Sequence, residues 1–356
     1  MTVATIAAAS AALGRDLTDL GALGGSDRSG VHRATHGDGT VVVKSYAGGT
    51  RLSWARERVG LAAAGAVGVA PRLLAVAADP PLVVMEDLGS APSVADRLLG
   101  DDAVAADEAL LAWAATLGRL HAATHADREA TARAFAEAEG AVAGDEPVDR
   151  FDAGMAGSLD RATVDWAANA ELLGLAGPPD VRALAASLLQ PHHHALSPAD
   201  VCPDNNLMTD GGLRLIDFEW SEVRHAAWDV SYLAVPWPTC WCSWRIPEAS
   251  AERALDAYRE EAVRGVPYVG TDAFLDDVEA ARVCWALVSV SWSLRHGLRE
   301  ESTPTPSGPS TRPRMQHRLQ QVAESGTAAA AFAGEVLEHT RQQWGDLALA
   351  LAPAYR

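Results

Sequence analysis

The sequence predicts an α+β protein with two lobes, a small antiparallel sheet followed by a larger helical part. Short runs rich in β-branched residues, such as Gly39 to Tyr46, concentrate in about the first 90 residues. Beyond Gly89, Ala- and Leu-rich segments with helical periodicity dominate. A patch without helical pattern, Leu196 to Asp217, interrupts these helices. We therefore expect one lobe over residues 1–88 and a second over 89–356, with a loop region at 196–220.

Length and composition limit the class of protein. The chain has 356 residues, 48% of them hydrophobic, which is enough for two lobes with cores of their own. Its net charge of -18 argues against binding to nucleic acid or to an anionic membrane surface. No apolar stretch is long enough to span a membrane, and the N-terminus lacks the basic region of a signal peptide. Four cysteines are too few for a disulfide scaffold, so we expect a cytoplasmic protein in which Cys202 is a packed thiol.

The first lobe is expected to contain two helices and several short strands. Helical patterns cover 3–14 and 52–67, and strand-like runs cover 39–46, 71–76 and 82–85. The glycine-rich stretch Leu20 to Thr35 fits a hairpin loop with exposed backbone N–H groups. In the second lobe, helical patterns are found at 93–100, 103–125, 127–140, 158–174, 180–190, 249–265, 272–299 and 316–350.

Lysine usage singles out one position. Of the 29 basic residues only Lys44 is a lysine, and it stands at the end of an apolar strand-like run. Such a lysine is often a solvated edge residue. Because arginine replaces lysine everywhere else, its retention favours a site that requires a compact charge on a flexible stem.

Three oxygen-bearing side chains stand in the central patch. Asp200 and Asn205 are five residues apart in a loop, and Asp217 ends the short strand Leu213 to Ile216. Taken alone, Asp200 and Asn205 favour the interpretation as turn residues that satisfy local backbone groups. Together with Asp217, they can converge on one point and offer the hard oxygen ligands that Mg²⁺ prefers.

These residues resemble a known family, the aminoglycoside phosphotransferases and choline-kinase-like small-molecule kinases, which share the protein-kinase fold. The family's H-G-D-x-x-x-x-N loop corresponds to Pro198-Ala-Asp200-Val-Cys-Pro-Asp-Asn205, and its I-D-F/W-E/G strand end to Ile216-Asp217-Phe-Glu219. The earlier landmarks follow in order: a glycine-rich loop at 24–30, Lys44, a helix glutamate at 57, and a hinge near 85–89. Asp229 matches the acid that braces the catalytic loop. Ser197-Pro-Ala199 stands where the family has its loop histidine.

The resemblance implies a bilobal protein-kinase-like fold and a role for each residue. Lys44 would bind the α- and β-phosphates of ATP or GTP and pair with Glu57. Asp200 would act on the acceptor hydroxyl, while Asn205 and Asp217 would hold Mg²⁺. The remaining nucleotide-binding residues fall into two groups: the glycine-rich loop with Gly25, Ser26 and Gly30, and the hinge with Met85, Glu86 and Leu88.

The tryptophan-rich segment Pro236 to Pro247 has two interpretations. Trp237, Trp241 and Trp244 fit either core packing or an aromatic wall for the acceptor, with Glu219 nearby. Acids at 248–261 would attract an amino-sugar substrate or form a solvated helix face. Both alternatives stay open for each segment.

The sequence thus predicts a phosphotransferase that uses ATP or GTP with Mg²⁺ and phosphorylates a hydroxyl group of a small molecule. An aminoglycoside-like or other natural-product antibiotic is the leading acceptor, so the chain is expected to confer antibiotic resistance. A kinase of choline, an amino sugar or a nucleoside is an alternative. A pseudokinase that binds nucleotide without turnover is another, favoured by the missing loop histidine and opposed by the intact Lys44, Asp200, Asn205 and Asp217. The oligomeric state, monomer or homodimer, is open.

Overall fold

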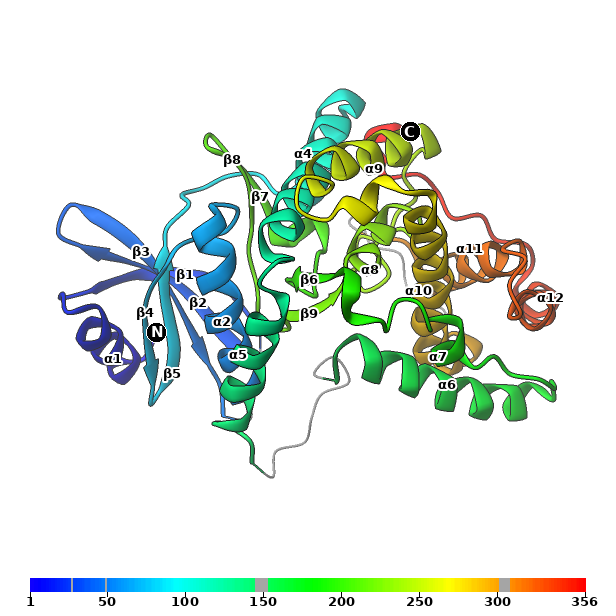
Figure 1. Cartoon of the computed structure of the whole chain (residues 1–356), viewed down its shortest axis with the longest axis horizontal. Helices are drawn as coiled ribbons and strands as arrows, with labels where there is room; N and C mark the ends of the chain where they lie inside the picture. Colours follow the sequence, from blue (N-terminus) through cyan, green and yellow to red (C-terminus); the bar gives the residue numbers. More distant parts are fainter. Residues whose placement is uncertain (27, 49, 145–152, 301–307) are drawn as a thin grey trace.

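The computed structural model describes residues 1–26, 28–48, 50–144, 153–300 and 308–356. A five-stranded sheet forms one lobe and a larger, mainly helical lobe lies beside it (Figure 1). The predicted α+β fold with two lobes is therefore confirmed. Within the described residues, no helix is long and apolar enough to cross a membrane.

The sheet of the smaller lobe is antiparallel throughout, with strand order β1-β2-β3-β5-β4. Its strands are β1 (Thr18–Gly25), β2 (Ser29–His36), β3 (Gly39–Tyr46), β4 (Leu73–Ala78) and β5 (Pro81–Glu86). The central strand β3 alternates its side chains between the two faces. Val41 and Val43 belong to the core on the side of helix α1 (Val3–Leu13), whereas Val42 and Tyr46 belong to the core on the side of helix α2 (Arg51–Val67). Lys44 shares the second face and so points towards α2.

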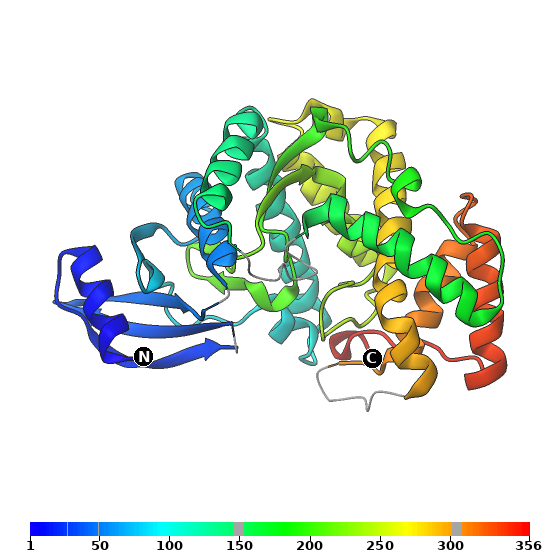
Figure 2. The same cartoon turned by 90° about the horizontal axis from the view of Figure 1, so that it is seen from below.

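Helix α1 covers the outer face of the sheet, on the side away from the helical lobe (Figures 1 and 2). Helix α2 covers the other face, and its Trp54 indole donates a hydrogen bond to the Leu82 carbonyl at 3.0 Å. Gly60 of α2 lies against the chain after β8, since a Cβ there would stand 2.9 Å from the Phe218 ring. Because Gly60 contacts Phe218, Glu57, one helical turn earlier, lies close to Asp217.

The glycine-rich stretch differs from the expected loop. Most of Leu20 to Thr35 is paired in β1, which ends at Gly25, and in β2, which begins at Ser29. The irregular register of β1 is compatible with its glycines, because Gly21 and Gly25 have φ angles of 124° and 146° that other residues rarely adopt. Strand pairing therefore satisfies many of the backbone N–H groups that the sequence analysis expected to be exposed in a loop.

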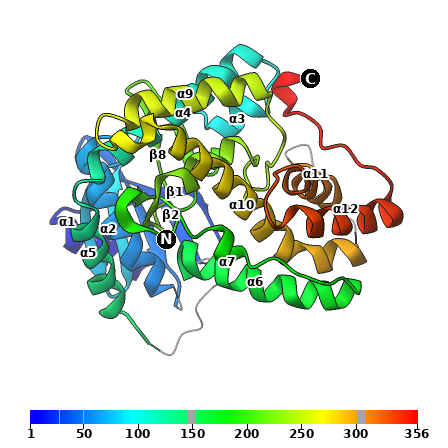
Figure 3. The same cartoon turned by 45° about the vertical axis from the view of Figure 1, so that its right-hand side comes forward.

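The second lobe contains the helices α3 (Val94–Leu98), α4 (Ala103–Thr124), α5 (Arg128–Gly140), α6 (Gly154–Leu173), α7 (Val181–Leu184), α8 (Ala226–Val230), α9 (Glu248–Ala262), α10 (Asp272–Arg299), α11 (Thr311–Ala323) and α12 (Ala330–Trp344). Helices α4 and α9 pack side by side, and α11 packs between α10 and α12 (Figure 3). The helix expected over 316–350 is therefore two helices. Gly326, at a φ of 68°, lies in the connection between them.

Two small two-stranded sheets enclose the central patch. Strand β6 (His194–Ser197) pairs with β9 (Glu222–His225), and β7 (Asn206–Thr209) pairs with β8 (Gly212–Leu215). Short 3₁₀ turns lie at Pro191–His193, Pro203–Asn205, Ser231–Leu233, Pro267–Gly270 and Pro353–Tyr355. The ladders fix where β6 ends and where β8 ends, so that the segments after them, with Asp200 and Asp217, belong to one rigid unit.

A buried contact between β9 and α10 makes the stability depend on pH. His225 of β9 lies 3.2 Å from the carboxylate of Asp277 on α10. Burial alone would raise the pKa of Asp277, but hydrogen bonds from His225, Ser187 and Tyr268 lower it to about 2. A lowered folded-state pKa stabilises the fold above the unfolded value of 3.8, and this contribution is lost as the pH falls through about 2.

We therefore expect Asp277→Asn to reduce the free energy of unfolding at pH 7 by about 1–2 kcal/mol. The difference from the parent chain should shrink between pH 4 and pH 2, measured by urea unfolding over that range. A difference that stays constant with pH would show that the carboxylate charge does not stabilise this contact.

Candidate active site

The chain turns sharply at both acidic positions of the central patch. Ala199, which follows β6, and Asp217, which follows β8, have φ angles of 65° and 66°, a region that non-glycine residues rarely occupy. Such backbone conformations occur often at functional sites and persist only where surrounding contacts hold them. Here the turn at Asp217 directs its carboxylate to Lys44 of the smaller lobe, and the turn at Ala199 immediately precedes Asp200.

Lys44 joins the two lobes through its ammonium group. Its Nζ lies 2.8 Å from a carboxylate oxygen of Glu57 and 2.6 Å from one of Asp217, 173 residues later in the chain. Glu219 contributes a third carboxylate at 3.2 Å. Lys44 is only 4% exposed. Burial by itself would lower the pKa of Lys44, but Asp217 and Glu57 outweigh this effect and raise it well above its ordinary value.

The carboxylates around Lys44 form a hard-oxygen cluster. Oxygens of Glu57, Asp217 and Glu219 lie within 4.8 Å of one another, and all three residues offer the ligand type that Mg²⁺ requires. Burial raises the pKa of Glu57 and Glu219, and the charge of Lys44 opposes this rise. All three carboxylates already pair with the Lys44 ammonium, and Asp217, whose side chain is 36% exposed, is the member of the set that fits an additional role as a Mg²⁺ ligand. Glu219 lies in this cluster, not in the expected acceptor wall.

Asp200 lies on the other side of this cluster, in the loop after β6. One of its carboxylate oxygens accepts a hydrogen bond from the Cys202 backbone N–H at 3.3 Å, and the Asn205 amide donates to its carbonyl at 3.4 Å. Burial raises the pKa of Asp200 to about 7, with the charges of Asp217 and Asp204 adding to the effect. A carboxyl group with a pKa near neutrality suits proton transfer at physiological pH.

An ionic network supports this loop where the family's histidine is absent. Arg224 of β9 donates to the Ala199 carbonyl at 2.8 Å and holds the fully buried carboxylate of Asp229 through two of its nitrogens. His121 of α4 lies 3.1 Å from the second oxygen of Asp229. Burial alone would raise the pKa of Asp229, but Arg224 and His121 hold it below its usual value. Arg224 thus ties the strained Ala199 to the core.

A cleft of about 370 Å³ opens between the sheet and the central patch. Its walls include Lys44, Glu57 and Asp217, together with the hinge residues Met85, Glu86 and Leu88. From the glycine-rich segment, Leu23 and Gly24 line the cleft. Gly25, Ser26 and Gly30 are not among its lining residues; instead the Ser26 N–H donates to the Ser29 carbonyl and closes the turn.

Sequence reasoning missed one ion pair at this cleft. Arg33 of β2 binds both carboxylate oxygens of Asp87, at 2.7 and 3.0 Å, and also donates to the Gly89 carbonyl. This bidentate pair fixes the hinge against the sheet. No local pattern marks it, because the partners are 54 residues apart.

The tryptophan-rich segment does not form the expected acceptor wall as a whole. Trp237 is fully buried and packs edge-on against Trp113 in the core. Trp244 is nearly buried beneath the Arg356 guanidinium. Trp241 is 47% exposed, and its indole donates to the Asp204 carboxylate at 2.8 Å. Trp241 thus contacts the loop that carries Asp200.

A different aromatic pocket lies beside Asp200. Its volume is about 30 Å³, and its lining includes Trp220, Trp228, Trp285 and the carboxylate-bearing Glu222. The indole N–H of Trp228 has no hydrogen-bond partner among the residues that the structure describes. Trp285 stands 57 residues after Trp228 in the sequence, so the fold brings these two together.

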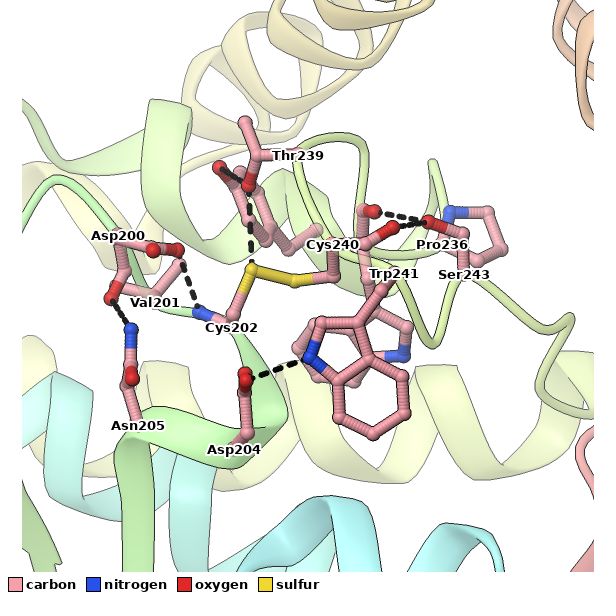
Figure 4. The surroundings of a disulfide bond; sticks show 12 residues. Asp200, Val201, Cys202, Asp204, Asn205, Pro236, Thr239, Cys240, Trp241 and Ser243 are labelled. Atoms are coloured by element: carbon pink, nitrogen blue, oxygen red, sulfur yellow. Dashed lines mark hydrogen bonds between the residues drawn. A yellow bond between two sulfur atoms is a disulfide. The ribbon is translucent and has the colours of Figure 1, made fainter. Parts of the chain in front are cut away.

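The expectation of a packed thiol at Cys202 is wrong. The structure joins Cys202 to Cys240 by a disulfide bond, with the two Cα atoms 5.8 Å apart (Figure 4). The two cysteines are 38 residues apart, and no local pattern links them. Cys240 stands next to Cys242 in a C-x-C pair, so the sequence did not show which cysteine would pair with Cys202.

The position of Lys44 leads to a prediction for nucleotide binding. In Lys44→Met the cleft loses its buried cation, and we expect ATP to bind about 10- to 100-fold more weakly, since hydrogen bonds to charged groups contribute about 1.5–3 kcal/mol. Isothermal calorimetry measures this directly. Arg15→Met, a change of the same kind at an exposed position on the far side of the lobe, should leave ATP binding unchanged. Equal affinity of Lys44→Met and the parent would show that Lys44 does not contact the phosphates.

Comparisons with known proteins agree with this geometry. The sequence model of the phosphotransferase enzyme family matches residues 21–266, more than half of the chain. Curated protein sequences gave no significant match. Among solved structures, an ethanolamine kinase of Plasmodium vivax is similar, with a TM-score of 0.51 and 13% identity over 89% of this chain and 84% of that one.

Two further solved structures are similar at lower TM-scores. A choline/ethanolamine kinase family protein of Mesorhizobium loti matches with a TM-score of 0.48 and 17% identity, over 91% of this chain and 94% of that one. A macrolide 2'-phosphotransferase of Brachybacterium faecium matches with a TM-score of 0.46 and 17% identity, over 81% and 92%. The family match covers both the sheet lobe and the central patch. The chain therefore belongs to the phosphotransferase enzyme family, as a small-molecule phosphotransferase with the bilobal protein-kinase-like fold.

Proposed function

We propose that the chain transfers the γ-phosphoryl group of ATP or GTP to a hydroxyl group of a small, amine-bearing molecule. The observation that carries this proposal is the meeting of Lys44, Glu57 and Asp217 at one cleft, with the Lys44 Nζ 2.6 Å from a carboxylate oxygen of Asp217, 173 residues later in the chain. Phosphoryl transfer needs mainly positioning and neutralisation of charge, and these residues offer both.

Each residue has one role in this proposal. Lys44, held by Glu57, binds the α- and β-phosphates, and the hinge at Met85 to Leu88 receives the base. Asn205 and Asp217 hold Mg²⁺, with Glu219 beside them; the ion would neutralise phosphate charge when bound. Asp200 accepts the proton of the acceptor hydroxyl as the oxygen attacks phosphorus. Its environment, which raises its pKa to about 7, supports this role.

The pocket beside Asp200 supports an amine on the acceptor. Tryptophan faces attract cations, and the Asp200 carboxyl lies in the same lining, whereas the Glu222 carboxylate is already paired with Arg224 at 3.1 Å. An aminoglycoside-like antibiotic satisfies this chemistry and is the first candidate. The proposed location of the protein is the cytoplasm, where it would meet both nucleotides and such antibiotics. Phosphorylation of the antibiotic would then confer resistance to it.

A small amino alcohol such as choline is the second candidate, and one observation favours it. The described residues leave a pocket of only about 30 Å³ beside Asp200, which is too small for a saccharide ring. The aromatic lining also suits a quaternary ammonium group.

Acceptor-dependent release of ADP or GDP tests the proposal. The purified chain is given Mg-ATP or Mg-GTP with a panel of aminoglycosides, choline, amino sugars and nucleosides. We expect release with amine-bearing alcohols and none with Asp200→Ala. Response to choline but not to aminoglycosides would select the second candidate. Nucleotide binding without release for any acceptor would instead indicate a pseudokinase.

A further inference from the structure

The disulfide bond lies inside the proposed catalytic loop. Cys202 follows Asp200 by two residues, and the Cys202 N–H is the donor to the Asp200 carboxylate. Figure 4 shows the bond running from this loop to the tryptophan-rich segment, where Cys240 stands. The two sulfurs and a carboxylate oxygen of Asp200 all lie within 4.8 Å of one another. A change in the position of the disulfide bond would therefore change the position of Asp200.

Weaker contacts accompany the covalent link. The Cys202 sulfur lies 3.3 Å from the Thr239 hydroxyl, which in turn contacts the Tyr232 hydroxyl at 3.0 Å. The Trp241 indole reaches Asp204 of the same loop. Without the bond, these few hydrogen bonds would hold loop and segment together, and each contributes only about 1 kcal/mol.

A small thiol or disulfide can approach the bond from one side. Both cysteines are only 4% exposed. Cys240 nevertheless lines a pocket of about 460 Å³ in the part of the chain that the structure describes, together with Trp241, Trp292 and Arg318. This volume lies within the range of small-molecule sites.

The remaining cysteines differ from this pair. Cys242 and Cys284 are free and buried. Burial raises the pKa of the Cys284 thiol to about 12 and that of Cys242 above its usual range, so neither forms the reactive thiolate readily. They serve as matched controls within the same chain.

We propose that Cys202 and Cys240 form a reversible oxidation site that controls phosphoryl transfer by fixing or releasing the catalytic loop. Oxidation holds Asp200 in the position described, and reduction frees the loop from the tryptophan-rich segment and slows transfer. The kinetic part of this inference rests on the proposed function. The nucleotide cleft is unaffected, because neither cysteine lines it.

The oxidant is a low-molecular-weight disulfide such as oxidised glutathione. The Cys240 thiolate attacks one of its sulfurs, the small S–S bond breaks, and one small thiolate leaves and takes up a proton. The Cys202 thiolate then attacks the Cys240 sulfur of the mixed disulfide and displaces the second small thiol. Two electrons pass from the protein to the small disulfide, which becomes two thiols. Excess small thiol reverses both steps.

Mass spectrometry and hydrogen exchange test the site without any acceptor. The full chain is equilibrated in glutathione buffers from reducing to oxidising, denatured and alkylated. We expect four alkylated cysteines in the reduced chain and two, Cys242 and Cys284, in the oxidised chain. Backbone amides of 200–206 and 236–247 should exchange faster after reduction. Four alkylated cysteines under every condition, or equal exchange in both states, would overturn the proposal.

Kinetics then test the control of activity. With an accepted substrate, the transfer rate should follow the fraction of bonded chain and fall about tenfold or more on full reduction, since small misplacements at a reacting centre have effects of this size. The KM for ATP should stay constant. Cys240→Ser should work at the reduced rate in every buffer, while Cys242→Ser should respond like the parent. A rate independent of the bond would refute the control. Changed thiol count and exchange, but no transfer in either state, would refute the proposed function alone.

Discussion

Asp200→Asn should abolish acceptor phosphorylation while leaving nucleotide binding intact. The amide keeps the size of the carboxyl group and its contact with the Cys202 N–H, but it cannot accept a proton. Positioned general bases contribute about 10²- to 10⁴-fold, so we expect kcat to fall by this factor. ATP affinity should change less than twofold, because Asp200 does not line the nucleotide cleft.

Asp204→Asn is the matched control for this prediction. Asp204 is an acid of the same loop, but its carboxylate is engaged by the Trp241 indole. We expect kcat to stay within about threefold of the parent, since a single hydrogen bond to a side chain contributes about 1 kcal/mol or less to loop position. Steady-state kinetics and calorimetry on both variants provide the comparison. Equal losses in the two variants would argue that Asp200 acts through the charge of the loop and not as a base.

Asp229→Asn should cause the largest loss of stability among single changes at this site. The carboxylate is fully buried, and the substitution leaves the Arg224 guanidinium in the interior without its main partner. Breaking a buried ion pair from one side costs about 3–5 kcal/mol. We expect urea unfolding to report this loss. Because Arg224 also holds the Ala199 carbonyl, transfer activity should fall in the folded fraction as well.

An exposed ion pair gives the control. Asp160 and Arg182 meet at 2.9 Å, but both side chains are about half exposed. Asp160→Asn should therefore lower the free energy of unfolding by about 0–1 kcal/mol, because water already screens this pair. If Asp229→Asn proved no more costly than Asp160→Asn, the network around Arg224 would not be what holds the loop.

The sequence alone was sufficient for the fold class and for the residues around Lys44. Apolar residues repeat about every 2 residues in strands and about every 3.6 residues in helices. This pattern is local, so strands and helices could be predicted from neighbouring residues. A lone lysine among arginines, and the spacing of Asp200, Asn205 and Asp217, are also visible along the chain. The structure pairs Lys44 with Glu57, as the resemblance implied, and it adds a contact of Lys44 with Asp217 that was not predicted.

Tertiary structure decided the features that depend on distant partners. Arg33 pairs with Asp87, 54 residues later, and His121 contacts Asp229, 108 residues later, and no local pattern marks either partnership. The same holds for Trp237, which the fold buries in the core, and for Cys202, which it joins to Cys240. Burial and pairing are set by which surfaces pack together. A sequence pattern states what each segment can form, but packing decides which side chains lose water and therefore need a partner.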